Sequence, residues 1–136
     1  MADVKTEMKA CSCGNREYAA CCARYLEGGQ PAPTAEALMR SRYTAYTLGR
    51  EDYLLATWHA STRPAALGLA EEAPAKWLGL DVKRHEVMDA EHAIVEFVAR
   101  YKVQGRAHRL HETSRFRREN GRWFYVDGDL HPLRKS

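Results

Sequence analysis

Residues 119–128 have the sequence ENGRWFYVDG, and this stretch decides how the second half of the chain folds. Asn120-Gly121 is a dipeptide preferred in two-residue β-hairpin turns, because both residue types tolerate positive φ. Aromatic and β-branched residues, which favour strands, occupy residues 123–126 directly after the turn. We therefore predict a hairpin whose second strand spans residues 122–127 and ends at Gly128.

The residues before this turn alternate as further half-buried strands do. Residues 107–118 divide into two faces, with Leu110, Glu112, Ser114 and Phe116 on one and His111, Thr113, Arg115 and Arg117 on the other. Residues 95–103 alternate in the same way, and Gln104-Gly105 supplies a turn between the two segments. Residues 79–88 are predicted to form another strand. Because tight turns join antiparallel neighbours, the expected sheet is an antiparallel meander.

The first half of the body is predicted to be helical. Thr34 is a good N-cap, and apolar residues recur at three-and-four spacing until Gly49, which suits a helix C-terminus. A second helix is expected from residue 51 or 52 to Trp58, before Pro64 disfavours continuation. Residues 64–77 are expected to be a loop with short helical turns. Helices followed by a meander predict an α+β fold, with the helices on one face of a curved sheet.

This order of elements resembles the nuclear transport factor 2-like (NTF2-like) cone. More specifically, the chain resembles the YchJ family over nearly its whole length, in the stretches LMRSRYTAY (38–46), DYL (52–54), TWH (57–59), WLGL (77–80), FVAR (97–100) and ENGRWFYVDG (119–128). Gly28-Gly29 and Pro31-Ala32-Pro33 mark a connection, so we place a boundary near residue 30, between a small element over residues 1–30 and an NTF2-like domain over residues 31–136. The resemblance implies no established activity, because the same cone serves enzymes and binding domains.

All four cysteines lie within twelve positions, as Cys11, Cys13, Cys21 and Cys22. Two close pairs of thiolates suit tetrahedral Zn²⁺, whereas Mg²⁺ and Ca²⁺ prefer oxygen ligands. Disulfide or redox use is the alternative, although adjacent cysteines bridge each other poorly and no C-x-x-C redox motif is present. We predict a closed four-cysteine zinc site, which favours a structural or docking role over catalysis.

The pattern C-x-C-G, then an aromatic residue, then C-C resembles the SEC-C motif, the small zinc-binding element at the C-terminus of the SecA translocase. Cys22 stands where that motif has histidine, and the turn at residues 14–17 is one residue shorter. SEC-C elements are associated with protein partners. The resemblance therefore implies that this element docks a protein.

The composition, 45% hydrophobic and 29% charged over 136 residues, is typical of a soluble globular protein. The sequence has no apolar run long enough to cross a bilayer and no signal-peptide core at residues 1–10, so we expect a cytoplasmic protein without a membrane partner. Residues 101–136 carry nine basic and four acidic residues. These arginines could attract nucleic acid, but we favour a solvated sheet face. The expected state is a monomer or a homodimer.

A curved sheet closed by helices is expected to leave a pocket, and its candidate residues are Arg42, Tyr43, Trp58, His59, Glu112, Ser114 and Asp127. The aromatic residues Trp77, Phe97, Phe116 and Trp123 are also candidates for its wall. Glu112 shares a strand face with apolar residues, a setting suited to a general base. The competing interpretation, which we favour, is that Glu112 forms an ion pair with Arg40 or Arg42 and locks helix to sheet.

Three classes of function follow from the sequence, and one of them, nucleic-acid binding through the C-terminal arginines, is described above. The first is a zinc-binding accessory protein whose cysteine element docks a protein partner. The alternative is a small-molecule carrier or enzyme that uses a polar pocket around Glu112.

Overall fold

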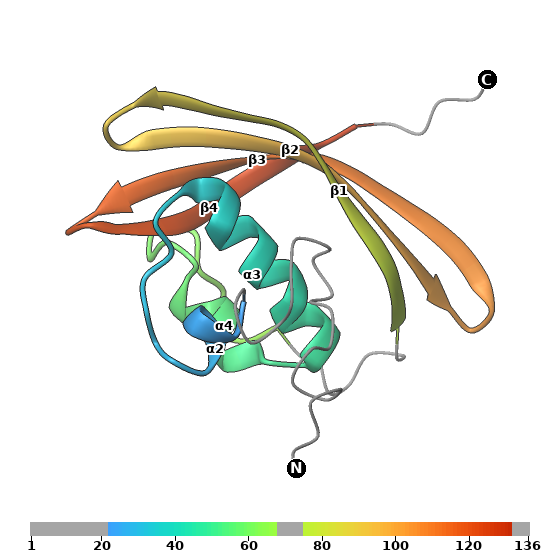
Figure 1. Ribbon diagram of the computed structural model, residues 1–136. Helices are drawn as coiled ribbons and strands as arrows, with labels where there is room; N and C mark the ends of the chain where they lie inside the picture. Colours follow the sequence, from blue (N-terminus) through green and yellow to red (C-terminus); the bar gives the residue numbers. More distant parts are fainter. Residues whose placement is uncertain (1–21, 68–74, 132–136) are drawn as a thin grey trace, which may run out of the picture.

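The computed structural model describes residues 22–67 and 75–131, where three helices pack against one four-stranded sheet. The helices are α2 (Ala23–Leu26), α3 (Ala35–Leu48) and α4 (Glu51–Ala56). The strands are β1 (Ala75–Asp89), β2 (His92–Val103), β3 (Arg106–Glu119) and β4 (Arg122–Leu130). The sheet arches over the helices, which all lie on its concave side (Figure 1). The predicted α+β architecture is confirmed.

The sheet is an antiparallel meander in the order β1-β2-β3-β4. Both predicted turns are present, with φ of 52° and 80° at Gln104-Gly105 and 53° and 77° at Asn120-Gly121. Strand β1 begins at Ala75, which pairs with Val103 at the end of β2. The expectation of a loop up to residue 77 was therefore wrong over its last three residues.

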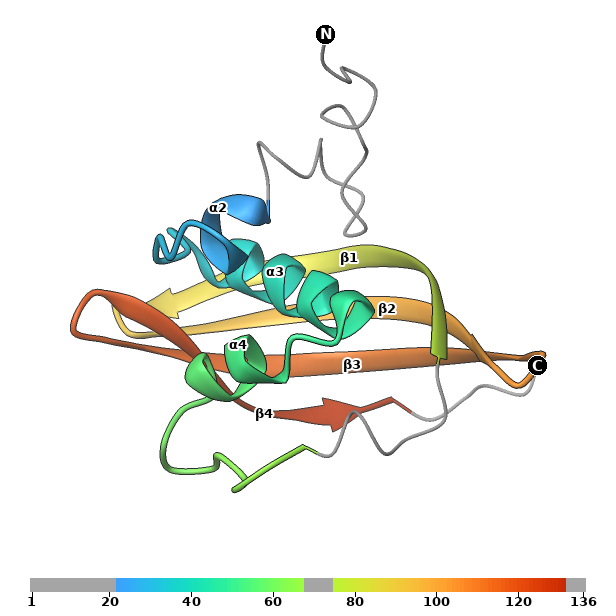
Figure 2. The same cartoon turned by 90° about the horizontal axis from the view of Figure 1, so that it is seen from below.

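Helix α3 has the ends that the sequence predicts. The Thr34 side chain accepts a hydrogen bond from the Ala37 amide at 3.0 Å, and Gly49 takes the left-handed conformation with φ of 70°. Figure 2 shows α3 lying along the sheet, with α2 and α4 on either side of it. None of the helices in the described part of the chain is long and apolar enough to cross a membrane.

The core lies between α3 and the concave face of the sheet. Alternate residues of β2, β3 and β4 point into it and are buried, namely Val95, Phe97, Ala99, Ser114, Phe116 and Trp123. Leu38, Met39 and Tyr43 of α3 are buried against them. Burial of each large apolar side chain contributes roughly 1.5–3 kcal/mol, so this interface holds the helix on the sheet.

A bulge in β4 changes which side chains face the core. Phe116 pairs with Tyr125 while its neighbour Arg115 pairs with Asp127, so Val126 is an extra residue on β4. Strict alternation would have placed Tyr125 and Asp127 on the same face. The strand also continues to Leu130, so the prediction that it ends at Gly128 was wrong.

The segment after α4 runs beside β4. The His59 amide donates to the Tyr125 carbonyl at 2.7 Å, and the Tyr125 amide donates to the Thr57 carbonyl at 2.9 Å. Trp58 therefore forms a short parallel bridge to Tyr125 and lies outside the helix, which ends at Ala56. At the opposite edge of the sheet, the register of β1 against β2 shifts at three places.

Candidate functional site

A pocket of about 250 Å³ lies between α3 and the concave face of the sheet. Its wall is mostly aromatic, with a few polar groups, and is formed by Met39, Arg42, Tyr43, Tyr46, Trp58, Trp77, Phe97, Ala99, Leu110, Glu112, Ser114, Phe116 and Tyr125. The rings meet edge to face, as Tyr43 does with Trp77 at 5.4 Å between centroids and Trp58 with Tyr125 at 5.0 Å. These contacts fix the shape of the pocket.

Glu112 on β3 provides the carboxylate of the pocket. Its Oε2 accepts hydrogen bonds from the Ser114 hydroxyl at 2.6 Å and from the Tyr125 hydroxyl at 3.4 Å. Gly128 lies beside it on β4, and a Cβ atom there would overlap the Glu112 carboxylate. The glycine therefore makes room for the acid.

Arg42 on α3 places a buried guanidinium at the same pocket. Its Nη1 donates to the Leu54 carbonyl and to the Thr57 hydroxyl, both at 2.7 Å. The guanidinium carbon also lies 5.2 Å from the ring centroid of Trp58 and 4.6 Å from that of Tyr125, close enough for cation–π attraction. Burial lowers the pKa of Arg42 below its ordinary value. Arginine nevertheless keeps its charge at neutral pH.

Tyr125 contacts both charged groups, Arg42 and Glu112. Burial raises the pKa of its hydroxyl above the ordinary tyrosine value, and the nearby Glu112 charge raises it further. The phenol therefore stays protonated at neutral pH and serves as a hydrogen-bond donor. The pocket thus offers a carboxylate acceptor, a hydroxyl donor and several aromatic faces.

Five of the seven predicted pocket residues line the pocket: Arg42, Tyr43, Trp58, Glu112 and Ser114. His59 does not, because its ring hydrogen bonds to Ser61 at 2.8 Å and to Glu119 at 2.9 Å. Asp127 is also absent from the wall, because the β4 bulge turns it to the outer face, where it accepts from Arg115 at 2.6 Å.

The expected ion pair of Glu112 with Arg40 or Arg42 was wrong. Arg40 hydrogen bonds to Glu36 at 2.9 Å, one helical turn away on α3. In the parts of the chain that the structure describes, Glu112 makes no ion pair within 4.0 Å. Its carboxylate is instead held by the two hydroxyls described above.

Sequence reasoning also missed or misplaced several wall residues. Tyr46 and Tyr125 were not proposed, although Tyr46 follows Arg42 and Tyr43 at helical spacing and Tyr125 follows the Asn120-Gly121 turn. Trp123 was proposed but lies by a second pocket, between the α2 region and the start of β4.

Of the four cysteines, Cys22 lies within the described residues, and Cys11, Cys13 and Cys21 lie outside them. Cys22 immediately precedes α2 and is fully buried. The Thr44 hydroxyl of α3 donates to its sulfur at 3.4 Å. Tyr25 and Leu26, which follow on α2, belong to the same hydrophobic core as the residues of the sheet.

Comparison with known proteins is consistent with this fold. Residues 34–128 match the family model described as "YchJ, middle NTF2-like domain". A "UPF0225 protein" of Chromobacterium violaceum is 63% identical over 133 residues, covering 94% of this chain and 98% of that protein.

Two solved structures are similar over most of the chain. One is the solution structure of a SEC-C motif containing protein from Rhodopseudomonas palustris, with a TM-score of 0.81 and 33% identity, covering 90% of this chain and 99% of that one. The other is the crystal structure of a SEC-C motif containing protein from Psychrobacter arcticus, with a TM-score of 0.74 and 26% identity, covering 95% and 86%. The NTF2-like fold is confirmed.

Proposed function

Because the chain belongs to the YchJ family, we propose that it is a zinc-binding accessory protein. Cys11, Cys13, Cys21 and Cys22 would hold one Zn²⁺, and the resulting element would dock a protein partner. Four thiolates leave no open coordination position, so the metal would supply structure rather than reactivity. The similarity to proteins that contain SEC-C motifs supports this assignment.

The observation that carries the proposal is the environment of Cys22. Its sulfur is buried, so a thiolate there would need a hydrogen-bond donor to offset the loss of water. The Thr44 hydroxyl donates to this sulfur. Metal-bound ligands are commonly supported by such outer contacts. Cys22 also sits at the start of α2, which packs in the main core. A metal held by Cys22 would therefore be attached firmly to the NTF2-like body.

The test of the metal is native mass spectrometry of the full chain purified without reductant, with three proteins compared. The natural chain is expected to carry one zinc, and a Cys11→Ser/Cys13→Ser variant none. Thr44→Val is expected to weaken zinc binding about 10- to 100-fold while preserving side-chain shape. A metal-free natural chain with a mass two or four hydrogens low would instead mean disulfides.

The test of docking compares the natural chain with the Cys11→Ser/Cys13→Ser variant. Affinity capture from a reducing cell extract is expected to recover a stoichiometric protein partner with the zinc-loaded chain and not with Cys11→Ser/Cys13→Ser. Equal recovery by both would place the docking surface elsewhere, provided that their circular dichroism spectra agree.

A second candidate function rests on Glu112. Its carboxylate accepts hydrogen bonds from two hydroxyls, has no cation within 4.0 Å among the residues that the structure describes, and faces an aromatic pocket of about 250 Å³. That volume exceeds the roughly 150 Å³ of a cavity known to hold benzene. We infer a ligand of one or two rings that donates a hydrogen bond to Glu112, which could also serve as a general base.

A fragment screen by NMR of the full chain tests this second function. Binders should shift the indole signals of Trp58 and Trp77, both in the pocket wall. Glu112→Gln should weaken those that carry a donor group at least tenfold and leave purely apolar binders unchanged. Equal affinities in both proteins would remove the carboxylate from the proposal.

A further inference from the structure

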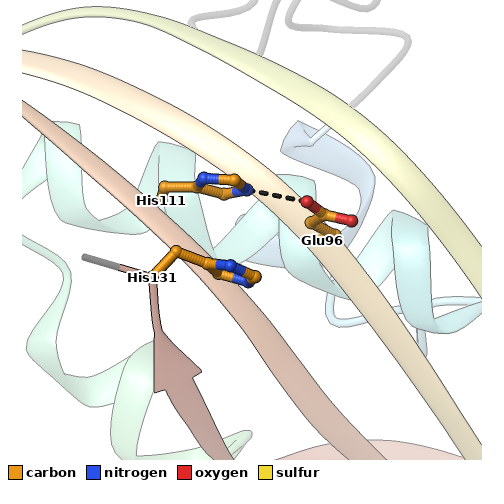
Figure 3. Close-up of side chains that lie close together, drawn as sticks. All are labelled: Glu96, His111 and His131. Carbon is orange, nitrogen blue, oxygen red and sulfur yellow. Dashed lines mark hydrogen bonds and ion pairs between the residues drawn. The ribbon is translucent and has the colours of Figure 1, made fainter. Parts of the chain in front are cut away.

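Three potential metal ligands meet on the convex face of the sheet, opposite the helices. Glu96 comes from β2, His111 from β3, and His131 directly follows β4 (Figure 3). One ligand atom from each residue lies within 4.8 Å of those of the other two. The His111 Nε2 and the Glu96 Oε2 are 2.7 Å apart. No spacing in the sequence indicates this cluster, because its members are far apart along the chain.

The sheet register brings the three residues together. Glu96 pairs with Thr113 and His111 pairs with Val98, so Glu96 and His111 are diagonal neighbours on one face. The His131 amide donates to the His111 carbonyl at 2.8 Å, which holds the residue after β4 beside β3. The two imidazole rings stack with centroids 4.0 Å apart and planes 12° apart. The backbone hydrogen bonds therefore hold the three residues at neighbouring positions on the sheet.

Arg84 is a charged neighbour of the cluster. It reaches the Oε1 oxygen of Glu96 at 3.4 Å but also pairs with Glu86 at 2.8 Å.

The cluster is also accessible and has adjustable contacts. The side chains of Glu96 and His111 are 21% and 26% exposed. His131 Nε2 is 2.8 Å from the Thr113 hydroxyl, a contact that a bond from Nε2 to a metal would replace. Two imidazoles and one carboxylate are a ligand set suited to zinc, cobalt or nickel rather than to magnesium or calcium.

We propose that Glu96, His111 and His131 form a second metal site, which binds a divalent late first-row ion such as Zn²⁺ or Co²⁺. Three protein ligands leave at least one position for water or an external ligand, unlike a closed four-cysteine site. The ion joins β2, β3 and the end of β4. The site lies on the face of the sheet opposite α2 and Cys22, so the two metal assignments are independent.

Cobalt titration of the full chain loaded with a single equivalent of Zn²⁺, which the four soft thiolates would take first, tests the site. Co²⁺ bound by imidazole and carboxylate gives weak visible bands, whereas cobalt bound by cysteine adds a strong thiolate charge-transfer band in the near ultraviolet. We expect one equivalent of Co²⁺ to bind without that band. We also expect His131→Ala and His111→Ala each to weaken the binding at least tenfold, and Glu96→Gln to weaken it measurably.

His92→Ala is the matched control. His92 is an exposed histidine of the same sheet whose ring is 2.9 Å from Asp89, so it offers two ligands where the proposed site offers three. This variant should bind Co²⁺ as the natural chain does. His131 follows the last strand, so its replacement should leave the fold intact, which a melting curve in EDTA would verify.

Two results would overturn the site. The first is the absence of a further equivalent of cobalt at millimolar concentration. The second is binding that His131→Ala leaves unchanged or that His92→Ala weakens equally. Neither result would bear on the cysteine element, whose cobalt signal is the charge-transfer band.

Discussion

At the scale of single residues, the Glu112 position depends on the missing side chain of Gly128. A Cβ atom at residue 128 would overlap the carboxylate and lie 2.8 Å from the Glu112 Cδ. Gly128→Ala must therefore move the acid and break its hydrogen bond from Ser114. We expect a loss of about 1–3 kcal/mol in the free energy of unfolding, measured by urea denaturation.

Gly79→Ala is the control for this substitution. Gly79 also lies in a strand, and a Cβ atom there would meet nothing within 4 Å. Its unfolding free energy should stay the same or rise by about 0.4–1 kcal/mol. Similar losses in both variants would mean that Gly128 matters for its backbone rather than for the space it leaves.

Arg42 is the second residue whose role can be isolated. Arg42→Met keeps the length of the side chain but removes the donors to Leu54 and Thr57 and the cation above two rings. We expect a loss of about 1–3 kcal/mol by urea denaturation, because the buried Leu54 carbonyl loses a charged donor. Arg100→Met, at an exposed position on β2, should change stability by less than about 0.5 kcal/mol.

The sequence predicted these pocket residues only in part, for a physical reason. Glu112 and Ser114 were found because strand alternation places them with Phe116. Asp127 was misassigned because the extra residue Val126 reverses the alternation, and no residue type in β4 marks such a bulge. The partner of Glu112 was also predicted wrongly, because spacing along the chain does not determine which side chains of α3 and of the sheet come into contact.

At the scale of elements, the two turns form a natural comparison. Gln104 and Asn120 occupy the same left-handed position before a glycine, with φ of 52° and 53°. Asparagine tolerates this conformation better than glutamine. Gln104→Asn should therefore raise the unfolding free energy by about 0.5–1 kcal/mol, and Asn120→Gln should lower it by a similar amount. Thermal unfolding of both variants measures the pair.

Changes of the same sign in both variants would contradict the argument from backbone conformation.

The turns were the best-predicted elements, because the preference of their residues for the turn depends only on the local backbone angle φ. The start of β1 was predicted less well. It is set by pairing of Ala75 with Val103, a contact between distant parts of the chain.

At the scale of the whole molecule, Cys22 connects the cysteine-rich segment to the body. Its side chain is fully buried, and Tyr25 and Leu26 carry the same core into α2. In metal-free protein, Cys22→Ser should lower the unfolding free energy by about 1–3 kcal/mol, because a hydroxyl replaces a small apolar group in the core. Urea denaturation in EDTA under reducing conditions gives this value.

Cys11→Ser is the companion variant, and without metal it should leave the urea midpoint of the body unchanged. A loss as large as that of Cys22→Ser would show that the whole cysteine segment supports the body.

The fold itself was predictable from the order of helices, turns and strands. The convex metal cluster was not, because it needs the register of three strands at once.

The two edges of the sheet suggest how the protein resists aggregation through strand pairing. A foreign strand that approached β4 would have to displace residues 57–59, which already occupy both backbone groups of Tyr125. The register shifts along β1 make that edge a poor template for regular strand addition. Lys83, Arg84 and Glu86 add charge there. Crowding inside a cell should therefore produce few amyloid-like contacts through this sheet, even though its strands are long.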